Sequence, residues 1–206
     1  SRGWLGVIIQ NVDMGLAESF GLSSSAGALV AGVLDDGPAD KAGVEAGDVI
    51  ITFDNTDIIV ASDLPHLVGR VKPGKKAKLN IIRQGKDKTL SLKVGELPLD
   101  EAVSRSSVNG ERPRTNRLGI QVEELTKERL RELGLSHGVV VSGVEAGPGN
   151  QSGIKRGDVI LLLNYQKVTS VGVFKSIARK IPAGKRVPVQ VNRHGNHLFV
   201  SVNLLE

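Results

Sequence analysis

The chain has 206 residues, of which 40% are hydrophobic and 24% are charged, a composition that excludes a disordered or fibrous protein and favours one or two globular domains. It has no cysteine, which excludes disulfides, thiol catalysis and thiolate metal sites. It has neither an apolar run near the ~20 residues of a membrane helix nor a signal sequence at its start, so we expect no membrane insertion. The start at Ser1, directly before a predicted strand, indicates a fragment of a longer protein.

The net charge of +5 is distributed unevenly along the chain. Residues 1–95 hold 11 basic and 11 acidic side chains, whereas residues 117–206 hold 13 and 7. Single-strand nucleic-acid binding combines basic side chains with aromatic stacking platforms, and aromatic residues make up only 3% of this chain. We therefore expect a mildly basic, solvated surface and no nucleic-acid partner.

The opening segment, residues 2–10, predicts a glycine-containing turn that leads into a β-branched strand. Gly3 and Gly6 allow backbone dihedrals and close approaches that other residues prevent, and successive amides in such a loop form an anion-binding nest. Leu5, Val7 and Ile9 share one face of the strand. A peptide C-terminus offers both a carboxylate for the loop and an apolar side chain for that face. For the motif alone, an ordinary strand start with two turn glycines is the alternative.

Each half of the chain repeats the same motifs, which is the strongest sign of its organisation. Leu5-Gly6-Val7 recurs as Leu118-Gly119-Ile120, and Gly47-Asp48-Val49-Ile50 recurs unchanged from Gly157 to Ile160. Arg83-Gln84-Gly85 likewise matches Arg193-His194-Gly195. A repeat near 90 residues is large enough for a small domain. The sequence therefore predicts a first domain at 1–95, a linker rich in Ser, Pro, Arg and Glu at 96–116, and a second domain at 117–206.

Within each copy the patterns predict an α+β domain, a small partly open β-barrel or sandwich with two flanking helices. Buried strands are expected, followed by hairpins at Gln84-Gly85 and His194-Gly195-Asn196. Short helices are expected after the opening strand and after Gly37 and Gly147, where proline follows glycine. A longer amphipathic helix is expected at 63–71, with Ser62 as its N-cap.

The long helix of each copy carries an apolar stripe that predicts either core packing or one wall of a groove beside the opening strand. An extended peptide would add itself to that strand. The residues predicted to bind it are Arg2, Gly3, Trp4, Leu5, Gly6, Val7, Ile8 and Ile9, with Leu64, Leu67, Val68 and Val71 of the helix. The corresponding groove of the second copy consists of Arg117, Leu118, Gly119, Ile120, Val122, Phe174, Ile177 and Ile181.

Two copies of this pattern resemble the tandem PDZ domains of bacterial Do/HtrA-type (Deg-family) serine proteases. The segments RGWLGV, GPADKAGVEAGDVI and SDLPHLVG are most similar to the MucD-like branch. The resemblance covers residues 2–206. It implies a periplasmic parent protease that assembles as trimers and larger cages. It also implies that the PDZ domains bind hydrophobic C-termini or unfolded segments, activate the protease and contact neighbouring subunits.

The second copy departs from the family pattern, because it lacks the glycine that matches Gly3 and because Phe174 would narrow its pocket. The resemblance leaves an assembly role as the alternative for this copy.

Catalytic motifs are absent from the sequence, including the Gly-Asn-Ser-Gly-Gly stretch of the protease active site. We therefore expect no enzymatic activity from this chain, no cofactor and no metal site. His194 and His197 have no third ligand nearby in sequence and are interpreted as part of a polar turn. His66 points away from the apolar stripe by helical periodicity and is predicted to lie on the surface. A free-standing two-PDZ scaffold is the alternative to a protease module.

Overall fold

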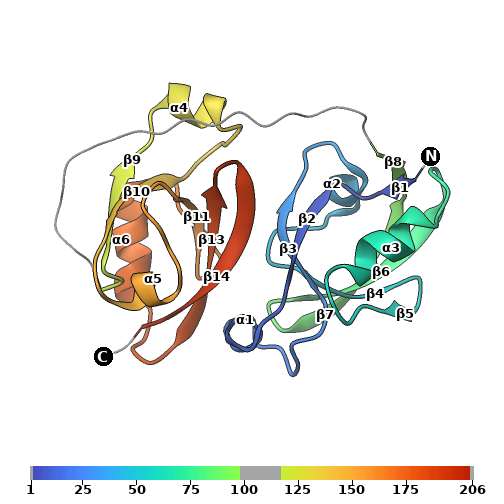
Figure 1. The fold of residues 1–206 in the computed structure, drawn as a ribbon, viewed down its shortest axis with the longest axis horizontal. Helices are drawn as coiled ribbons and strands as arrows, with labels where there is room; N and C mark the ends of the chain where they lie inside the picture. The colour runs from blue at the N-terminus through green and yellow to red at the C-terminus, as the bar shows by residue number, and fades with distance from the viewer. Residues whose placement is uncertain (1, 98–116, 205–206) are drawn as a thin grey trace. The chain divides into compact units, whose positions relative to one another are not determined.

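The computed structural model describes residues 2–97 and 117–204, which form two compact units, Ser1–Ala102 and Val103–Glu206 (Figure 1). Of the predicted linker, only Glu96 and Leu97 lie in the described part of the chain. Glu96 belongs to the first unit, because it pairs with Gly3 in a two-stranded sheet. The division at 1–95, 96–116 and 117–206 otherwise stays a prediction.

The first unit contains an antiparallel sheet with strand order β2-β3-β4-β6-β7, in which β5 pairs only with β4. A separate two-stranded sheet joins β1 to β8. Its elements are β1 (Gly3–Trp4), β2 (Val7–Asn11), α1 (Met14–Ser19), β3 (Ala28–Val33), α2 (Pro38–Ala42), β4 (Val49–Phe53), β5 (Thr56–Asp57), α3 (Asp63–Gly69), β6 (Lys76–Arg83), β7 (Lys86–Lys93) and β8 (Gly95–Glu96).

The second unit repeats this topology, with strand order β14-β13-β11-β10-β9 and β12 paired to β11. Its elements are β9 (Ile120–Glu124), α4 (Lys127–Glu132), β10 (Val139–Val144), α5 (Pro148–Gln151), β11 (Val159–Leu163), β12 (Gln166–Lys167), α6 (Val171–Lys180), β13 (Arg186–Arg193) and β14 (Asn196–Asn203). The predicted α+β class and the internal repeat are confirmed, and the described strands of each unit form an open sheet rather than a closed barrel.

The hairpin turns form where both central residues take positive φ values. Gln84 and Gly85 have φ of 49° and 78°, and His194 and Gly195 have φ of 51° and 83°, the left-handed pair that matches the twist of the flanking strands. The hairpins predicted at both positions are confirmed by the continuous β6–β7 and β13–β14 ladders.

Helix α3 ends at Gly69, two residues before the predicted end, and its predicted N-cap is only partly right. Ser62 occupies the N-cap position but makes no side-chain capping bond. The Asp63 carboxylate instead accepts the N–H groups of Ile59 and Val60 at 3.0 and 3.1 Å, in the loop that precedes the helix. In the second unit, by contrast, Ser170 caps α6 by accepting the N–H of Val173.

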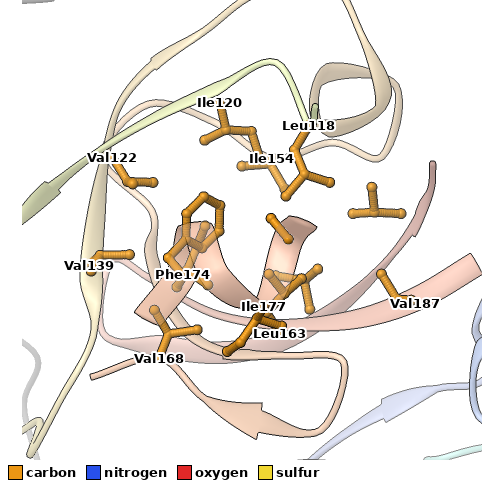
Figure 2. Packing of buried hydrophobic residues seen from close by; sticks show 14 of the residues in the cluster. Leu118, Ile120, Val122, Val139, Ile154, Leu163, Val168, Phe174, Ile177 and Val187 are labelled. Atoms are coloured by element: carbon orange, nitrogen blue, oxygen red, sulfur yellow. The ribbon is translucent and has the colours of Figure 1, made fainter. Parts of the chain in front are cut away.

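Each unit buries its own apolar core between the sheet and the long helix. In the second unit Phe174 of α6 is fully buried, and Figure 2 shows its ring pointing into a cluster with Val122, Val139 and Val168. In the first unit the equivalent Leu64 is 1% exposed. Burying a side chain of this size stabilises the fold by about 1.5 to 3 kcal/mol, so these helices are held mainly by tertiary packing.

A buried ion pair connects the repeated Gly-Asp-Val-Ile segment to the hairpin of each unit. The Arg83 guanidinium donates to both carboxylate oxygens of Asp48, at 2.7 and 2.8 Å, and to the carbonyl of Gly43. Arg193 makes the same set of bonds to Asp158 and Gly153. Each aspartate is almost completely buried, and each also accepts a backbone N–H, from Glu45 or Lys155. The repeat therefore conserves a hydrogen-bonded pair as well as an apolar core.

We expect the second unit to lose stability in mild acid because it contains two histidines whose pKa is lowered by burial, His137 and His197. A histidine with a lowered folded-state pKa favours the neutral ring, so the unfolded state binds more protons as the pH falls through about 6.5. The stability that the neutral rings contribute is present above that pH and lost below it. Thermal unfolding between pH 7.5 and 5.5 should show a larger fall in Tm for the unchanged protein than for a His137→Gln/His197→Gln variant. Equal pH dependence of the two proteins would contradict this assignment.

Candidate peptide-binding site

Strand β2 forms an edge of the first unit's sheet, since among the described residues it pairs only with β3. Ile9 lies opposite Val30 of β3, and the N–H of Val30 donates to the carbonyl of Asp48, on the side of β3 away from β2. The carbonyl of Gly6 accepts the N–H of Leu34. Neighbouring residues of an antiparallel strand point their backbone groups to opposite sides. The N–H and C=O groups of Val7 and Ile9 therefore point toward the open edge, as strand addition requires.

The loop before β2 is held to the fold through its carbonyl groups. The carbonyl of Leu5 accepts the N–H of Ala39 and that of Gly6 accepts the N–H of Leu34, both at 2.9 Å. Within residues 2–97, no hydrogen bond is described in which the amide of Leu5 or Gly6 is the donor. Gly6 has a φ of +74°, and a Cβ added there would lie 3.2 Å from the Trp4 ring. The loop thus offers donors beside a half-buried indole, the chemistry of a carboxylate nest.

Gly3 serves a different purpose from the one that the sequence predicted. It lies in β1, outside the left-handed region in which Gly6 is found. A Cβ at Gly3 would lie 2.3 Å from the carbonyl oxygen of Val68 and 2.6 Å from that of Val71. Glycine is therefore required because β1 passes directly against the C-terminal end of α3.

Helix α3 and the loop before it contact both ends of the opening segment, residues 3–11. At one end Gly3 packs against the last turn of the helix, and at the other the side chain of Asn11 accepts the N–H of Ala61 at 2.8 Å. Between these two points, residues of α3 and of β2 contact the same apolar core. Asn11 was not among the predicted site residues, although its place at the end of the opening strand was visible in the sequence.

By their burial, the predicted apolar residues divide into the floor and the two walls of the predicted groove. Leu5, Leu64 and Val68 are 3%, 1% and 4% exposed and belong to the core, so they form the floor. The walls remain half-buried and keep accessible apolar surface; they are Val7 and Ile9 on β2, with Leu67 and Val71 at α3. The remaining predicted residues are Ile8, which alternates to the opposite face of β2, and Arg2, which is exposed.

The outer surface of α3 carries polar groups. His66 is exposed, as the helical periodicity predicted. The pKa of Asp63 lies below its usual range, chiefly because the carboxylate accepts the N–H of Val60 and also that of Ile59. Asp63 therefore stays negatively charged in mild acid at the end of the predicted groove where α3 begins.

The second unit ties its helix to its opening strand in the same two places but with other groups. Glu124 accepts the N–H of Val171 at 2.7 Å, and Arg117 donates to the carbonyl of Ile181 at 2.8 Å. Gly119 keeps the left-handed conformation of Gly6, with a φ of +68°. The predicted apolar groove residues are all in the core, none more than 6% exposed: Leu118, Ile120, Val122, Phe174, Ile177 and Ile181.

The described residues provide no grouping of three or more His, Asp or Glu side chains arranged to hold a metal ion. None of the helices in the described part of the chain has the length and apolar character that crossing a bilayer requires.

The two repeated units match the family model of the PDZ domain, over residues 3–94 and 116–204, and the chain belongs to this family. A probable periplasmic serine endoprotease DegP-like from Pseudomonas fulva (strain 12-X) is 49% identical over 209 residues, covering 100% of this chain and 43% of the relative. The relative of the same name from Hahella chejuensis (strain KCTC 2396) is 42% identical over 98% of this chain and 44% of its own length. The chain thus spans less than half of these relatives. Among solved structures, the HtrA-type protease AlgW with decapeptide is 40% identical over 48% of this chain and 30% of its own, with a TM-score of 0.45.

Proposed function

We propose that the first domain binds hydrophobic C-terminal or unfolded peptide segments by adding them as a strand to the open edge of β2. The observation that supports this proposal most directly is the loop at Leu5 and Gly6, whose carbonyls face the fold while no described bond uses their amides. The terminal carboxylate accepts these donors, the peptide backbone pairs with Val7 and Ile9, and the last side chain enters between the two apolar walls.

The expected affinity follows from the size of this contact. Burying one Leu- or Val-sized side chain contributes about 1.5 to 3 kcal/mol, and each net hydrogen bond contributes about 0.5 to 1.5 kcal/mol. Ordering an extended peptide offsets part of this gain. The result is a Kd in the micromolar range, about −8 kcal/mol, which suits reversible recognition of substrates.

We further propose that the chain is the substrate-recognition and regulatory module of a periplasmic serine endoprotease involved in protein quality control. The name of its relatives, which it matches over its whole length, supports this role. In the parent protein, peptide binding couples to activation of a protease domain and to assembly with neighbouring subunits. Membership of the MucD-like branch stays a prediction.

The second domain has a different role in this proposal, in which it contributes to assembly more than to peptide capture. Its groove residues are buried, so the apolar surface that a peptide side chain needs is already covered. Two domains of one topology thus divide recognition and assembly between them.

Peptide binding should change the fluorescence of Trp4, the only tryptophan in the chain, because its ring lies over Gly6 in the proposed carboxylate loop. We expect a saturable change on titration with a short peptide that ends in Val, Leu or Phe. The same peptide with an amidated C-terminus should bind at least about fivefold more weakly, because the amide carries no charge for the nest. Fluorescence titration gives both Kd values.

A peptide of the same composition with aspartate as its last residue is the control for apolar recognition, and it should bind weakly. Equal affinities of the free and amidated peptides would contradict carboxylate recognition by the loop.

A further inference from the structure

The loop between β5 and α3 exposes two neighbouring β-branched side chains. Ile59 is 60% exposed and Val60 is 43% exposed, and together they form a feature that we name the apolar knuckle. Adjacent exposed apolar side chains of this size are candidates for an interaction site when the backbone holds them in place.

The backbone of the apolar knuckle is held by hydrogen bonds to Asp63 and Gly27. The Asp63 carboxylate accepts the N–H groups of Ile59 and Val60, and the carbonyl of Ile59 accepts the N–H of Gly27 at 3.1 Å. The next residue, Ala61, donates to the side chain of Asn11 on β2. The two apolar side chains are therefore presented to solvent by a preorganised loop, which lowers the entropic cost of binding a partner.

The knuckle lies at the end of the groove opposite to the carboxylate loop. The bond from Ala61 to Asn11 places the knuckle at the C-terminal end of β2. Asn11 lies five residues after Gly6 in the sequence. A peptide that pairs antiparallel with β2 starts with its C-terminus at Gly6 and advances about 3.4 Å per residue. Its last five residues match Val7–Asn11, and the residue about six positions from its C-terminus reaches the knuckle.

The second domain shows that the fold does not need this feature. The N–H of Ala61 donates to Asn11, and the N–H of Val171 donates to Glu124, so Ala61 and Val171 occupy the same position in their loops. In this alignment Thr169 and Ser170 replace Ile59 and Val60, and Lys167 replaces Asp57. The apolar knuckle thus occurs in the domain whose groove walls are accessible and is absent from the domain whose groove is buried.

Three carboxylates lie on the chain segments next to the knuckle. Asp57 lies two residues before Ile59, Asp63 binds the knuckle's own amides, and Asp13 follows Asn11 by two residues. An apolar pair with acidic groups nearby suits a peptide segment that carries an apolar side chain next to a basic one.

We infer that the apolar knuckle is an upstream subsite of the peptide groove, which binds an apolar side chain about six residues before the ligand's C-terminus and favours a neighbouring lysine or arginine. This inference rests on the proposed function of the first domain. It assigns to the groove a preference for longer ligands of defined composition, beyond recognition of the terminal residues.

Calorimetry with three peptides that share their last four residues tests the inference. The first is the tetrapeptide, the second an octapeptide with leucine at the sixth and lysine at the seventh position from its end, and the third the octapeptide with serine and glutamate at these positions. The leucine-lysine octapeptide should bind about five- to tenfold more tightly than the other two. In an Ile59→Thr/Val60→Ser variant, which copies the second domain, this advantage should disappear while the affinity for the tetrapeptide stays the same.

The outcomes separate the inference from the proposed function. If no peptide binds to the unchanged protein, the proposed function itself fails. If the tetrapeptide binds but the leucine-lysine octapeptide gains nothing, or keeps its gain in the Ile59→Thr/Val60→Ser variant, only the upstream subsite is overturned. An Asp57→Lys variant should bind the leucine-lysine octapeptide more weakly than the unchanged protein does, because a positive charge replaces a negative one, while its affinity for the tetrapeptide stays the same.

Discussion

Replacing Asp48 by alanine should destabilise the first domain by roughly 3 kcal/mol, the largest effect on stability that we expect from a single substitution outside the apolar core. The change leaves the Arg83 guanidinium, whose side chain is 19% exposed, without the carboxylate that accepts two of its bonds. It also leaves the partly buried hydrogen bond from the N–H of Glu45 without its acceptor. The estimate lies at the lower end of the range for breaking a buried pair because Arg83 can recover part of its hydration.

Glu45→Ala is the matched control for this prediction, because Glu45 also pairs with Arg83, at 3.5 Å, but is 67% exposed. An exposed pair is worth about 0.5 kcal/mol, so this variant should unfold almost like the unchanged protein. Urea denaturation followed by Trp4 fluorescence reports on the first domain, whereas far-UV circular dichroism reports on both. Asp158→Ala should shift the circular dichroism transition and leave the fluorescence transition in place. Equal shifts of the fluorescence transition for Asp48→Ala and Glu45→Ala would contradict the prediction that the buried ion pair stabilises the domain more than the exposed one.

Gly6→Val should weaken binding of a C-terminal peptide to the first domain by at least about tenfold, equivalent to ~1.4 kcal/mol. The left-handed φ of +74° costs a non-glycine residue about 1 to 2 kcal/mol. The loop will therefore either rotate its amides out of the carboxylate-binding position or keep that position at this energetic cost. The added side chain also meets the Trp4 ring, whose atoms lie 3.2 and 3.3 Å from the Cβ position. Both effects disturb the donors that hold the carboxylate.

Gly43→Val separates loss of binding from loss of stability. Gly43 ends α2 with a φ of +87°, and a Cβ at this position meets no atom within 4 Å. Gly43→Val should therefore lower the stability of the first domain about as much as Gly6→Val does, while the peptide affinity measured by calorimetry stays unchanged. A Gly119→Val variant should likewise leave peptide affinity intact, because the second groove is buried. Peptide affinity retained in Gly6→Val would show that the loop does not recognise the ligand.

Much of the local geometry of the candidate site could be predicted because local patterns fix it. The alternation of Leu5, Val7 and Ile9 predicts one face of a strand, and the glycine at position 6 predicts the left-handed turn before it. The reason for Gly3 could not be predicted, since it depends on the approach of α3, which is more than 60 residues away in sequence. The bond between Asn11 and Ala61 is hidden for the same reason.

The residues of the ion pair could be recognised in the sequence as repeated positions, but their pairing could not. Asp48 and Arg83 both belong to segments that recur in the second copy as Asp158 and Arg193, so the repeat marks them as equivalent. Only the folded chain brings each arginine within 3 Å of its aspartate, because the hairpin of β6 and β7 returns to the turn before β4.

The sequence by itself determined the internal repeat, the hairpin turns and the opening strand of each domain, because these depend on short-range dihedral preferences and on periodicity. The family was indicated by the resemblance of its segments to known proteins. It could not decide which of two similar apolar stripes leaves surface for a ligand. That decision belongs to the tertiary structure, in which Leu67 and Val71 stay half-buried while Phe174, Ile177 and Ile181 are packed into the core. The physical reason is that burial is a property of everything that packs on a side chain, including residues far away in the sequence.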